Sequence, residues 1–258
     1  MEGSSRMQYL GKKSVRVKDL RRRIRHRVEG EVIIEGAKLL DDLIRWDVDI
    51  SELYLAEGLS DSAEAGPWVA AAEQVFELDA EVLAGVAPTR TPQGVLAVAE
   101  VPRWPMWSAS EGVGLYLEGI QDPGNVGAII RSAAGLGAAA VLLAPGCADP
   151  WGPSAVRGSA GAVFRIPVER DVPLSRAGDR LRHHQGELWA TGSKGRSLEE
   201  WNPSLPILLM LGAEGRGLSP EAVAAADGVV TIPLQREVES LNVAVAAGIV
   251  LSHLDNPG

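Results

Sequence analysis

Three short segments in the C-terminal half contain polar and charged side chains that could do chemistry. The first, residues 122–125, reads D-P-G-N, and Arg131 follows it in an apolar run. The second, residues 211–217, reads L-G-A-E-G-R-G, and the third, residues 239–242, reads E-S-L-N. Amide, carboxylate and guanidinium groups can bind and orient a polar or phosphorylated ligand. The three segments are therefore candidate walls of a ligand site.

The third segment contains the least expected side chain. The apolar run 229–233 predicts a strand, and the alanine-rich run 240–254 predicts a helix with Ser240 as its N-cap. Asn242 would then lie in the first turn of a helix of buried composition, where an amide needs partners. Open α/β sheets place their ligands beyond the carboxyl ends of strands. We therefore interpret this segment as a surface that faces a ligand.

Several common catalytic arrangements are not predicted. All four histidines lie outside the three segments: His26, His183, His184 and His253. A histidine base is therefore not expected, and no set of histidines and carboxylates has the spacing of metal ligands. The glycines match neither a Rossmann fingerprint nor a P-loop. A tight turn capped by Asn125 and a loop with solvated Glu214 and Arg216 are the simpler alternatives, but they leave Arg131 in an apolar helix unexplained.

Alternating strands and helices would position these segments. Apolar runs predict strands at 114–120, 140–144, 163–168, 187–191, 206–211 and 229–233. Helical spacing predicts helices at 125–136, 153–160, 173–184, 219–225 and 240–254. This alternation predicts an α/β fold with a mostly parallel sheet and helices on both faces.

A smaller α/β unit precedes this sheet. Strands at 32–34, 50–55, 75–78 and 94–101 are predicted to alternate with helical segments at 35–46, 66–74 and 80–84. The stretch P-R-W-P then excludes regular structure, and its Trp104 and the nearby Trp107 are expected to pack on one of the domains. We predict four parts: a basic arm at 1–28, a small domain at 29–103, a linker at 104–112 and a larger domain at 113–258.

Charge is unevenly distributed along the chain. The formal net charge is −9, yet residues 12–27 contain nine Lys or Arg and one Asp. Such a basic stretch is a candidate phosphate-binding element, in particular for RNA or DNA. The candidate contacts are Arg21, Arg22, Arg23 and Arg25. A frayed solvated tail or the exposed face of a helix is the alternative.

Composition limits the remaining classes. The single Cys147 excludes an internal disulfide framework and a cysteine-based zinc site, and it fits a reducing compartment. No apolar run reaches about 18 residues, so no membrane span is predicted. The N-terminus lacks the apolar core of a signal peptide, and a cytoplasmic protein is expected.

Together, the motifs resemble the SpoU/TrmH-type RNA 2′-O-ribose methyltransferases of the SPOUT superfamily. The resemblance is carried by D-P-G-N-V-G-A-I-I-R-S-A (122–133), L-G-A-E-G-R-G-L (211–218) and I-P-L-Q-R-E-V-E-S-L-N-V-A-V-A (232–246). R-G-S-A-G-A-V-F-R-I-P-V (157–168) is similar to the middle segment of that family. In the first half, V-E-G-E-V-I-I-E-G-A-K-L-L (28–40) and T-P-Q-G-V-L-A-V (91–98) are similar to its appended substrate-recognition domain.

The resemblance implies a fold and a cofactor. The C-terminal sheet would be tied in a trefoil knot, with the segment 230–254 threaded through a loop. The cofactor would be S-adenosylmethionine, bent in the knot and held largely by backbone groups. The matching cofactor positions are Leu211, Gly212, Ile232 and Leu241. The protein would be a homodimer with each active site near the subunit interface.

The resemblance also implies roles for side chains. Arg131 would be the proton acceptor or an anchor for the RNA phosphate, and Asn125 would position Arg131 or the ribose. Glu214 would orient an arginine or the nucleotide. Ser240 and Asn242 would line the third wall, and Arg216 would bind phosphate.

Ribosomal RNA, most of all 23S ribosomal RNA, is the expected substrate. The alternatives are a transfer RNA and a ribosomal RNA methylation that protects against an antibiotic. A non-catalytic RNA-binding assembly factor on the same fold is the rival from another class. A dinucleotide-dependent oxidoreductase is disfavoured because the Rossmann fingerprint is absent.

Overall fold

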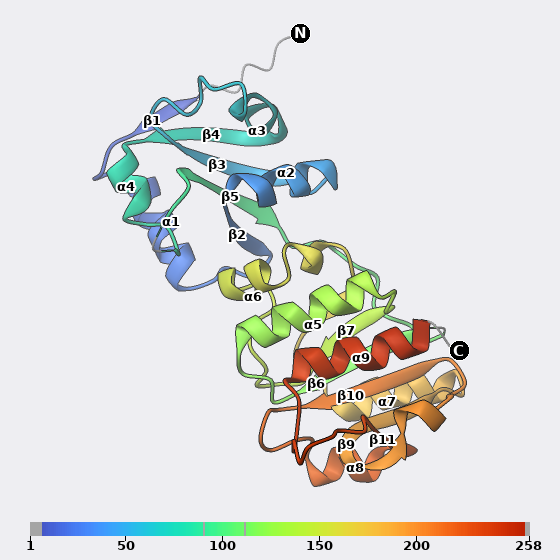
Figure 1. Ribbon diagram of the computed structural model, residues 1–258. Coiled ribbons are helices and arrows are strands. Elements are labelled where there is room, and N and C mark those ends of the chain that lie inside the picture. Colours follow the sequence, from blue (N-terminus) through green and yellow to red (C-terminus); the bar gives the residue numbers. More distant parts are fainter. Residues whose placement is uncertain (1–6, 90, 111, 256–258) are drawn as a thin grey trace. The chain divides into compact units, whose positions relative to one another are not determined.

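The computed structural model describes residues 7–89, 91–110 and 112–255, and the chain divides into two compact units (Figure 1). Unit 1 comprises Met1–Arg103 with Trp151–Pro153. Unit 2 comprises Trp104–Pro150 and Ser154–Gly258. The main division therefore falls between Arg103 and Trp104.

Unit 1 is built on a five-stranded mixed sheet in the order β1-β4-β3-β5-β2. Its strands are β1 (Gln8–Leu10), β2 (Glu31–Glu35), β3 (Ile50–Ala56), β4 (Ala72–Leu78) and β5 (Val95–Glu100). Its helices are α1 (Val15–Arg25), α2 (Ala37–Arg45), α3 (Ala65–Ala71) and α4 (Ala80–Ala84). Strands β1, β4 and β3 run parallel, whereas β5 is antiparallel to both β3 and β2.

The basic segment folds as part of unit 1, which corrects the prediction of a separate arm at 1–28. Residues 15–25 form helix α1, and the side chain of Ser14 caps its start by accepting a hydrogen bond from the Arg16 N–H. Val17 and Leu20 are buried in the same apolar cluster as residues of the sheet. Residues 1–6 of the predicted arm lie outside the described residues.

Arg23 corrects the prediction of four RNA contacts, because it points into unit 1. Its side chain is only 7% exposed. It donates to the carboxylates of Glu31 and Glu52 and to the hydroxyl of Tyr54. Burial is the largest single effect and would lower the pKa of Arg23, but the hydrogen bond to Glu52 and the charges of Glu52, Tyr54 and Glu31 together outweigh it and raise the pKa. Arg23 therefore fastens α1 to the sheet and does not face solvent.

Unit 2 is built on a six-stranded parallel sheet in the order β11-β9-β10-β6-β7-β8. Its strands are β6 (Val113–Glu118), β7 (Ala140–Leu143), β8 (Val168–Glu169), β9 (Glu187–Ser197), β10 (Ile207–Gly212) and β11 (Gly228–Thr231). Its helices are α5 (Pro123–Gly135), α6 (Pro153–Gly158, beginning at the boundary), α7 (Leu174–His183), α8 (Pro220–Ala225) and α9 (Val243–Asp255). Two short 3-10 helices are η1 (Ala162–Phe164) and η2 (Leu198–Glu200). The predicted α/β fold with a parallel sheet is confirmed.

Two predicted elements of unit 2 differ in the structure. The strand expected at 163–168 is η1 followed by the two-residue β8, because Gly161 takes a left-handed conformation (φ 80°) that starts a tight turn. The helix expected from Ser240 begins at Val243, so Ser240 is not its N-cap.

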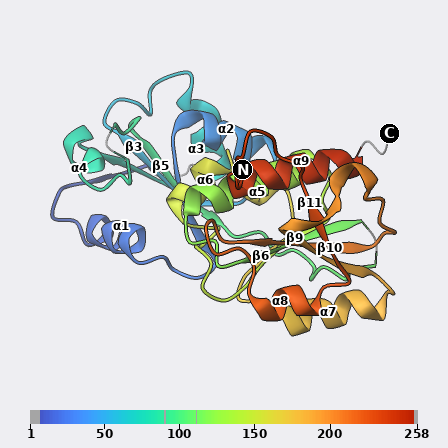
Figure 2. The same ribbon diagram turned by 60° about the horizontal axis from the view of Figure 1, so that its bottom comes forward.

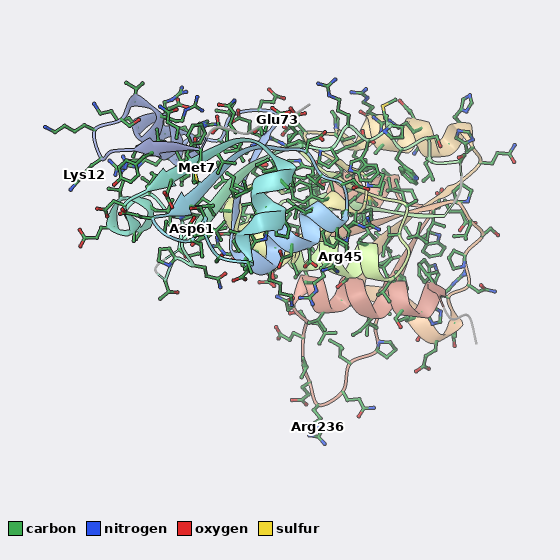
Figure 3. All side chains as sticks on the ribbon, turned by 90° about the horizontal axis from the view of Figure 1, so that it is seen from above. Met7, Lys12, Arg45, Asp61, Glu73 and Arg236 are labelled. Atoms are coloured by element: carbon green, nitrogen blue, oxygen red, sulfur yellow. The ribbon has the colours of Figure 1, made fainter. Side chains whose placement is uncertain are left out.

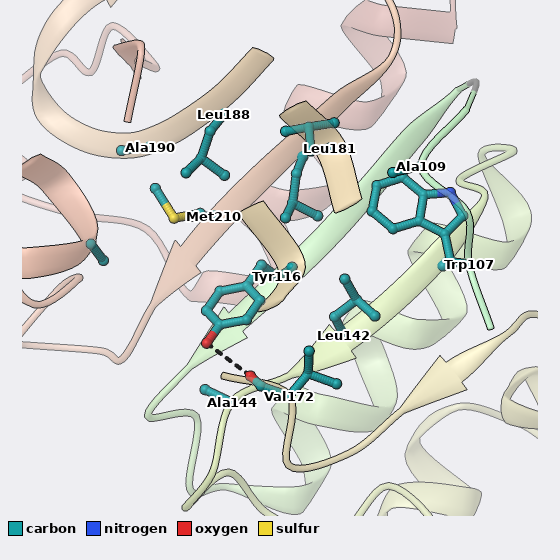
Figure 4. Packing of buried hydrophobic residues seen from close by; sticks show 14 residues of the cluster. Trp107, Ala109, Tyr116, Leu142, Ala144, Val172, Leu181, Leu188, Ala190 and Met210 are labelled. Atoms are coloured by element: carbon teal, nitrogen blue, oxygen red, sulfur yellow. Dashed lines mark hydrogen bonds between the residues drawn. The ribbon is translucent and has the colours of Figure 1, made fainter. Parts of the chain in front are cut away.

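Helices cover both faces of the parallel sheet. Helices α5 and α9 pack together on one face, and α7 and α8 lie on the other (Figures 1 and 2). The core beneath α7 and α8 contains Tyr116, whose buried hydroxyl donates to the Val172 carbonyl over 3.1 Å (Figure 4). Trp107 from the predicted linker joins this core, and its ring occupies the space that a Cβ at Gly114 would need.

The order of strands creates a crevice at the carboxyl ends of the parallel strands, between β6 and β10. After β6 the chain moves outward to β7 and β8, whereas β10, β9 and β11 lie on the other side of β6. The loops after β6 and β10 lead to α5 and α8, which cover opposite faces (Figure 2). Ligands of open parallel sheets bind at such a switch point, beyond the carboxyl ends of the strands. The knot that the resemblance implies stays a prediction.

Candidate active site

Three of the predicted side chains meet at this crevice. Asn125 follows β6, Glu214 follows β10 and Asn242 follows β11. The Oε1 atom of Glu214 accepts hydrogen bonds from Nδ2 of Asn125 (3.2 Å) and Nδ2 of Asn242 (2.7 Å). Asn242 Nδ2 also donates to Oδ1 of Asn125 over 3.0 Å. We call these three residues the amide–carboxylate triad.

The start of α5 leaves the Asn125 side chain available for this triad. Asp122 is the N-cap, and its Oδ1 accepts a hydrogen bond from the backbone N–H of Asn125 over 2.9 Å. Pro123 occupies the first turn, where its fixed φ suits a helix and no N–H donor is lost. The alternative in which Asn125 caps the helix is therefore wrong.

Asn242 holds the triad and the last helix together. Its Oδ1 accepts from the backbone N–H groups of Ala244 (2.9 Å) and Val245 (3.3 Å), so Asn242 has the capping role expected of Ser240. The backbone N–H of Val243 points at Glu214 Oε1 over 3.4 Å. The start of α9 is thus held beside a carboxylate, which complements the positive end of the helix dipole.

A cavity of about 650 Å³ opens beside the triad. It is lined by residues 118–122 and Asn125 on one side and by residues 213–214 and 216–220 on the other, with Val243. The charged residues of its lining are Glu118, Asp122, Glu214 and Arg216. Three carboxylates against one guanidinium give the cavity a negative charge that suits a cationic ligand.

None of the predicted cofactor positions is among the described residues that line this cavity, although Leu211 and Gly212 directly precede the lining residue Ala213. Leu211 and Gly212 end β10, and Leu211 is buried. A Cβ at Gly212 would come within 2.2 Å of the Gly217 carbonyl carbon, so only glycine allows the loop to close over the strand end. Ile232 follows β11 and Leu241 precedes Asn242, and both are half-buried.

Arg131 lies on α5, nearly two turns beyond Asn125, and its side chain is exposed. It forms no hydrogen bond or ion pair with any other residue that the structure describes. Arg216 is exposed at the cavity, and Ser240 is exposed two residues before Asn242 without a hydrogen bond to the triad. The structure therefore brings together three of the five predicted catalytic residues and leaves Arg131 and Ser240 facing solvent.

Sequence reasoning missed Glu118 and Ser219. Glu118 ends β6, and its carboxylate accepts from the backbone N–H (2.7 Å) and the hydroxyl (3.0 Å) of Ser219. Two signals could have revealed the pair: a charged residue closing an apolar strand, and Ser219 directly before Pro220, which is typical of a helix start.

A second hollow lies between α5 and α9. It is lined by Ala128, Ser132, Asn242, Ala244, Val245, Gly248, Ile249 and Ser252. Val245 and Ile249 are 51% and 37% exposed, so this hollow presents apolar side chains to solvent.

The described residues contain neither a candidate membrane span nor a candidate metal site. No helix there combines the length and the hydrophobicity that crossing a membrane requires. No group of three or more His, Cys, Asp or Glu side chains there is arranged to hold a metal ion.

The fold and the triad define an α/β domain with a polar ligand site at the switch point of a parallel sheet. The model of the SpoU rRNA methylase family matches residues 112–252, and that of the MRM3-like substrate binding domain matches residues 13–97. The chain belongs to the SpoU rRNA methylase family.

Curated relatives support this assignment over most of the chain. An uncharacterised tRNA/rRNA methyltransferase of Synechocystis is 31% identical over 237 residues, which covers 86% of this chain and 83% of the relative. The 23S rRNA (guanosine(2553)-2′-O)-methyltransferase RlmP of Bacillus subtilis is 30% identical over 223 residues, covering 86% and 87%.

Solved structures agree with the whole fold. An rRNA methyltransferase from Sinorhizobium meliloti with bound AdoMet has a TM-score of 0.81 at 28% identity and covers 96% of this chain and 97% of its own. An RNA 2′-O ribose methyltransferase has a TM-score of 0.79 at 29% identity, with 96% and 98% covered.

Proposed function

We propose that this protein transfers a methyl group from S-adenosylmethionine to a ribose 2′-hydroxyl of RNA, with 23S ribosomal RNA as the substrate. The observation that carries the proposal is the amide–carboxylate triad at the switch point, with Arg131 on the helix that also carries Asn125 and bonded to none of the residues that the structure describes. Membership of the SpoU rRNA methylase family supports the reaction class. The relative RlmP, which acts on 23S rRNA, supports the substrate.

The residues at the crevice fit the cofactor. S-adenosylmethionine carries a positively charged sulfur, and the carboxylates of Glu118, Asp122 and Glu214 make the cavity negative. The close approach at Gly212 lets the loop 213–218, which lines the cavity, fold back against the end of β10. We propose that Leu211, Gly212, Ile232 and Leu241 hold the cofactor through their backbone.

The chain must orient the ribose 2′-hydroxyl, whose proton would pass to solvent water as the oxygen takes the methyl group. When bound, the cofactor supplies a methyl group already activated by the charge on its sulfur. Holding the ribose oxygen in line with that methyl group is the main task of the chain, and the fixed amides of Asn125 and Asn242 suit it. Glu214 keeps both amides in place.

We assign Arg131 to the RNA backbone. A guanidinium stays protonated near neutral pH and is therefore a poor base, whereas it binds phosphate through two parallel hydrogen bonds. In that position it also stabilises the negative charge that develops on the ribose oxygen. Arg216 and Ser240 are proposed as further contacts to RNA or cofactor at the mouth of the crevice.

Unit 1 is proposed as the RNA-binding part, in line with the match to a substrate binding domain. Residues 29–103 and the solvent face of α1 would bind RNA around the target, residues 104–112 would connect the units, and residues 113–258 would carry the reaction. A cytoplasmic location follows from a ribosomal substrate.

A homodimer is also part of the proposal. The apolar hollow on α5 and α9 adjoins Asn242, which itself belongs to the triad. A second copy seated there would bury Val245 and Ile249 and complete the surroundings of the site.

Tritium transfer from labelled S-adenosylmethionine to RNA tests the function. We expect incorporation into 23S ribosomal RNA and a ribose-methylated nucleotide that disappears when the gene is deleted. Incorporation into transfer RNA alone would overturn the substrate, and incorporation into no cellular RNA would favour a non-catalytic RNA-binding assembly factor.

Exchanging Arg131 tests its assignment. Arg131→Ala is expected to lower the methyl-transfer rate by about a hundredfold or more, because both anchoring and charge stabilisation are lost. Arg131→Lys keeps the charge but not the two parallel bonds, so partial activity is expected. If the parent's pH–rate profile has an ionisation that vanishes in Arg131→Lys, Arg131 acts as the base and the anchoring assignment is wrong.

A further inference from the structure

The loop that carries Glu214 is anchored at both ends on a single residue, Glu118. At its start, Gly212 of β10 pairs with Glu118 of β6 in the parallel ladder. At its end, Ser219 donates its backbone N–H and its hydroxyl to the two carboxylate oxygens of Glu118, over 2.7 and 3.0 Å. The loop 213–218 is therefore a closed arc on the end of β6.

The arc is also closed internally, which makes it stiff. The N–H of Gly217 donates to the Ala213 carbonyl over 2.8 Å, and these two residues form an isolated bridge. Glu214 lies at the tip of the arc, between the two bridged residues. A displacement of Ser219 would therefore be passed to Glu214 and could not be absorbed by a slack loop.

Glu118 also precedes the other half of the site. Residues 119–122 lead directly from Glu118 to Asn125 at the start of α5, and both segments line the cavity. The pairing of β6 with β10 and the bonds between Glu118 and Ser219 therefore determine the distance between Asn125 and Glu214. Ser219 additionally caps α8 by accepting from the Ala222 N–H over 3.1 Å.

We propose that Glu118 is a positioning residue for methyl transfer, which acts by holding the Glu214 arc through Ser219. Glu118 does not touch the reacting atoms in this role. Its two hydrogen bonds fix where Glu214 presents its Oε1 to Asn125 and Asn242. The inference rests on the proposed function, because the positioned residues are those assigned to the methyl-transfer site.

A double-mutant cycle tests this role in the full-length protein with saturating cofactor and RNA. Glu118→Ala is expected to lower the single-turnover rate by about tenfold to a hundredfold, since a misplacement of about 1 Å can have that effect. In the Glu214→Ala background the same substitution should lower the rate by less than about twofold, because the residue through which Glu118 acts is gone. Equal effects in both backgrounds would overturn the proposal.

Asp227 provides a matched control. Its carboxylate also accepts a backbone N–H, that of Leu188 over 2.7 Å, but at the amino ends of the strands. Asp227→Ala should lower the melting temperature about as much as Glu118→Ala and leave the single-turnover rate within about twofold of the parent. A similar rate loss in Asp227→Ala would mean that Glu118 supports only the fold, and would overturn the proposal.

Side-chain amide resonances give a readout that needs no activity. Glu118→Ala, and the isosteric Glu118→Gln if the alanine variant does not fold, should shift the Nδ2 signals of Asn125 and Asn242, whereas Asp227→Ala should not. Unchanged signals would overturn the proposal. If the parent shows no methyl transfer but the Glu118 variant still shifts these signals, the proposed function is wrong, whereas Glu118 still positions the Glu214 arc.

Discussion

At the scale of single residues, Glu214 joins the two amides of the site. One oxygen atom, Oε1, takes hydrogen bonds from two side-chain amides and lies 3.4 Å from a backbone N–H. Hydrogen bonds to a charged acceptor are about twice as strong as neutral ones. The two amides are therefore oriented before any ligand arrives, which is the arrangement expected of a site that positions a reactant.

Replacing Asn242 with aspartate separates its two tasks. Asn242→Asp keeps an oxygen that caps α9 but loses the Nδ2 donor and sets a negative charge against Glu214. We expect a melting temperature within a few degrees of the parent and a loss of methyl transfer of about tenfold or more, from one lost charge-assisted bond. Asn242→Ala, which removes both tasks, should also lower the melting temperature; if the aspartate variant stays fully active, the triad is not needed for the reaction.

Cys147 should be slow to react with thiol reagents. Burial raises the pKa of its thiol, and the Sγ donates to the Leu117 carbonyl over 3.2 Å. A raised pKa lowers the thiolate fraction at pH 8, and only the thiolate is nucleophilic. Labelling with a disulfide reagent should therefore be at least about tenfold slower in the native protein than in urea. Equal rates would show that the thiol is accessible and its pKa ordinary.

The polar residues of the site could be predicted from the sequence, whereas their local roles could not. Asn125, Glu214 and Asn242 stand out because an apolar context makes a polar side chain conspicuous. The exchange of capping roles between Ser240 and Asn242 could not be predicted, because either residue type can cap and the strand–helix connection sets the register. Glu118 was missed because its partner Ser219 lies 101 positions away.

At the scale of elements, α1 shows how a basic segment can be both structural and exposed. Lys18, Arg21, Arg22 and Arg25 fall at helical spacing on one side, and Val17 and Leu20 are buried on the other. Arg22 donates to Asp19, and this hydrogen bond lowers the pKa of Asp19. The sequence indicated only a basic arm, because two buried apolar residues among so many charges give a weak periodic signal.

Neutralising the solvent face of α1 should weaken RNA binding without harming the fold. Figure 3 shows that the nearby Lys12 also extends into solvent. Arg21→Gln with Arg25→Gln is expected to reduce the affinity for RNA and to flatten its dependence on salt. The slope of log K against log salt should fall by about 0.7 for each lost phosphate contact. An unchanged slope would mean that α1 does not contact RNA.

The buried face of α1 should respond in the opposite way. Arg23→Gln removes the cationic partner of Glu31 and leaves Glu52 with only the partly exposed Arg16, so it should destabilise the fold. We expect thermal unfolding of unit 1 at a lower temperature, while the salt slope of RNA binding by the folded protein stays as in the parent. If Arg23→Gln changes the salt slope of RNA binding and leaves the unfolding temperature unchanged, Arg23 contacts RNA after all.

At the scale of the whole molecule, the alternation of strands and helices predicted the fold class of unit 2 and the presence of a smaller unit before it. The strand order was not predictable from alternation, because it depends on which crossovers pass to which side of β6. That order decides where the crevice lies. The site could therefore be predicted as three loops but not as a triad.

The proposed dimer predicts a charge-sensitive surface. Val245→Asp places a carboxylate in the apolar hollow on α5 and α9 and should convert the protein to a monomer with reduced methyl transfer. Val15→Asp is the control, because Val15 is 81% exposed on α1 and belongs to unit 1. Sedimentation should give a dimer for the parent and the control only; a monomeric parent would contradict the dimer.

The triad also has a consequence for how the chain folds. Glu214 bonds to residues 89 positions earlier and 28 positions later, and Asn125 and Asn242 are 117 positions apart. Contacts of such long range form late, because the loops between them must close first. A refolding chain would therefore regain most of its helical signal before it regains a site, and the recovery of cofactor binding would report only the last and slowest step of folding.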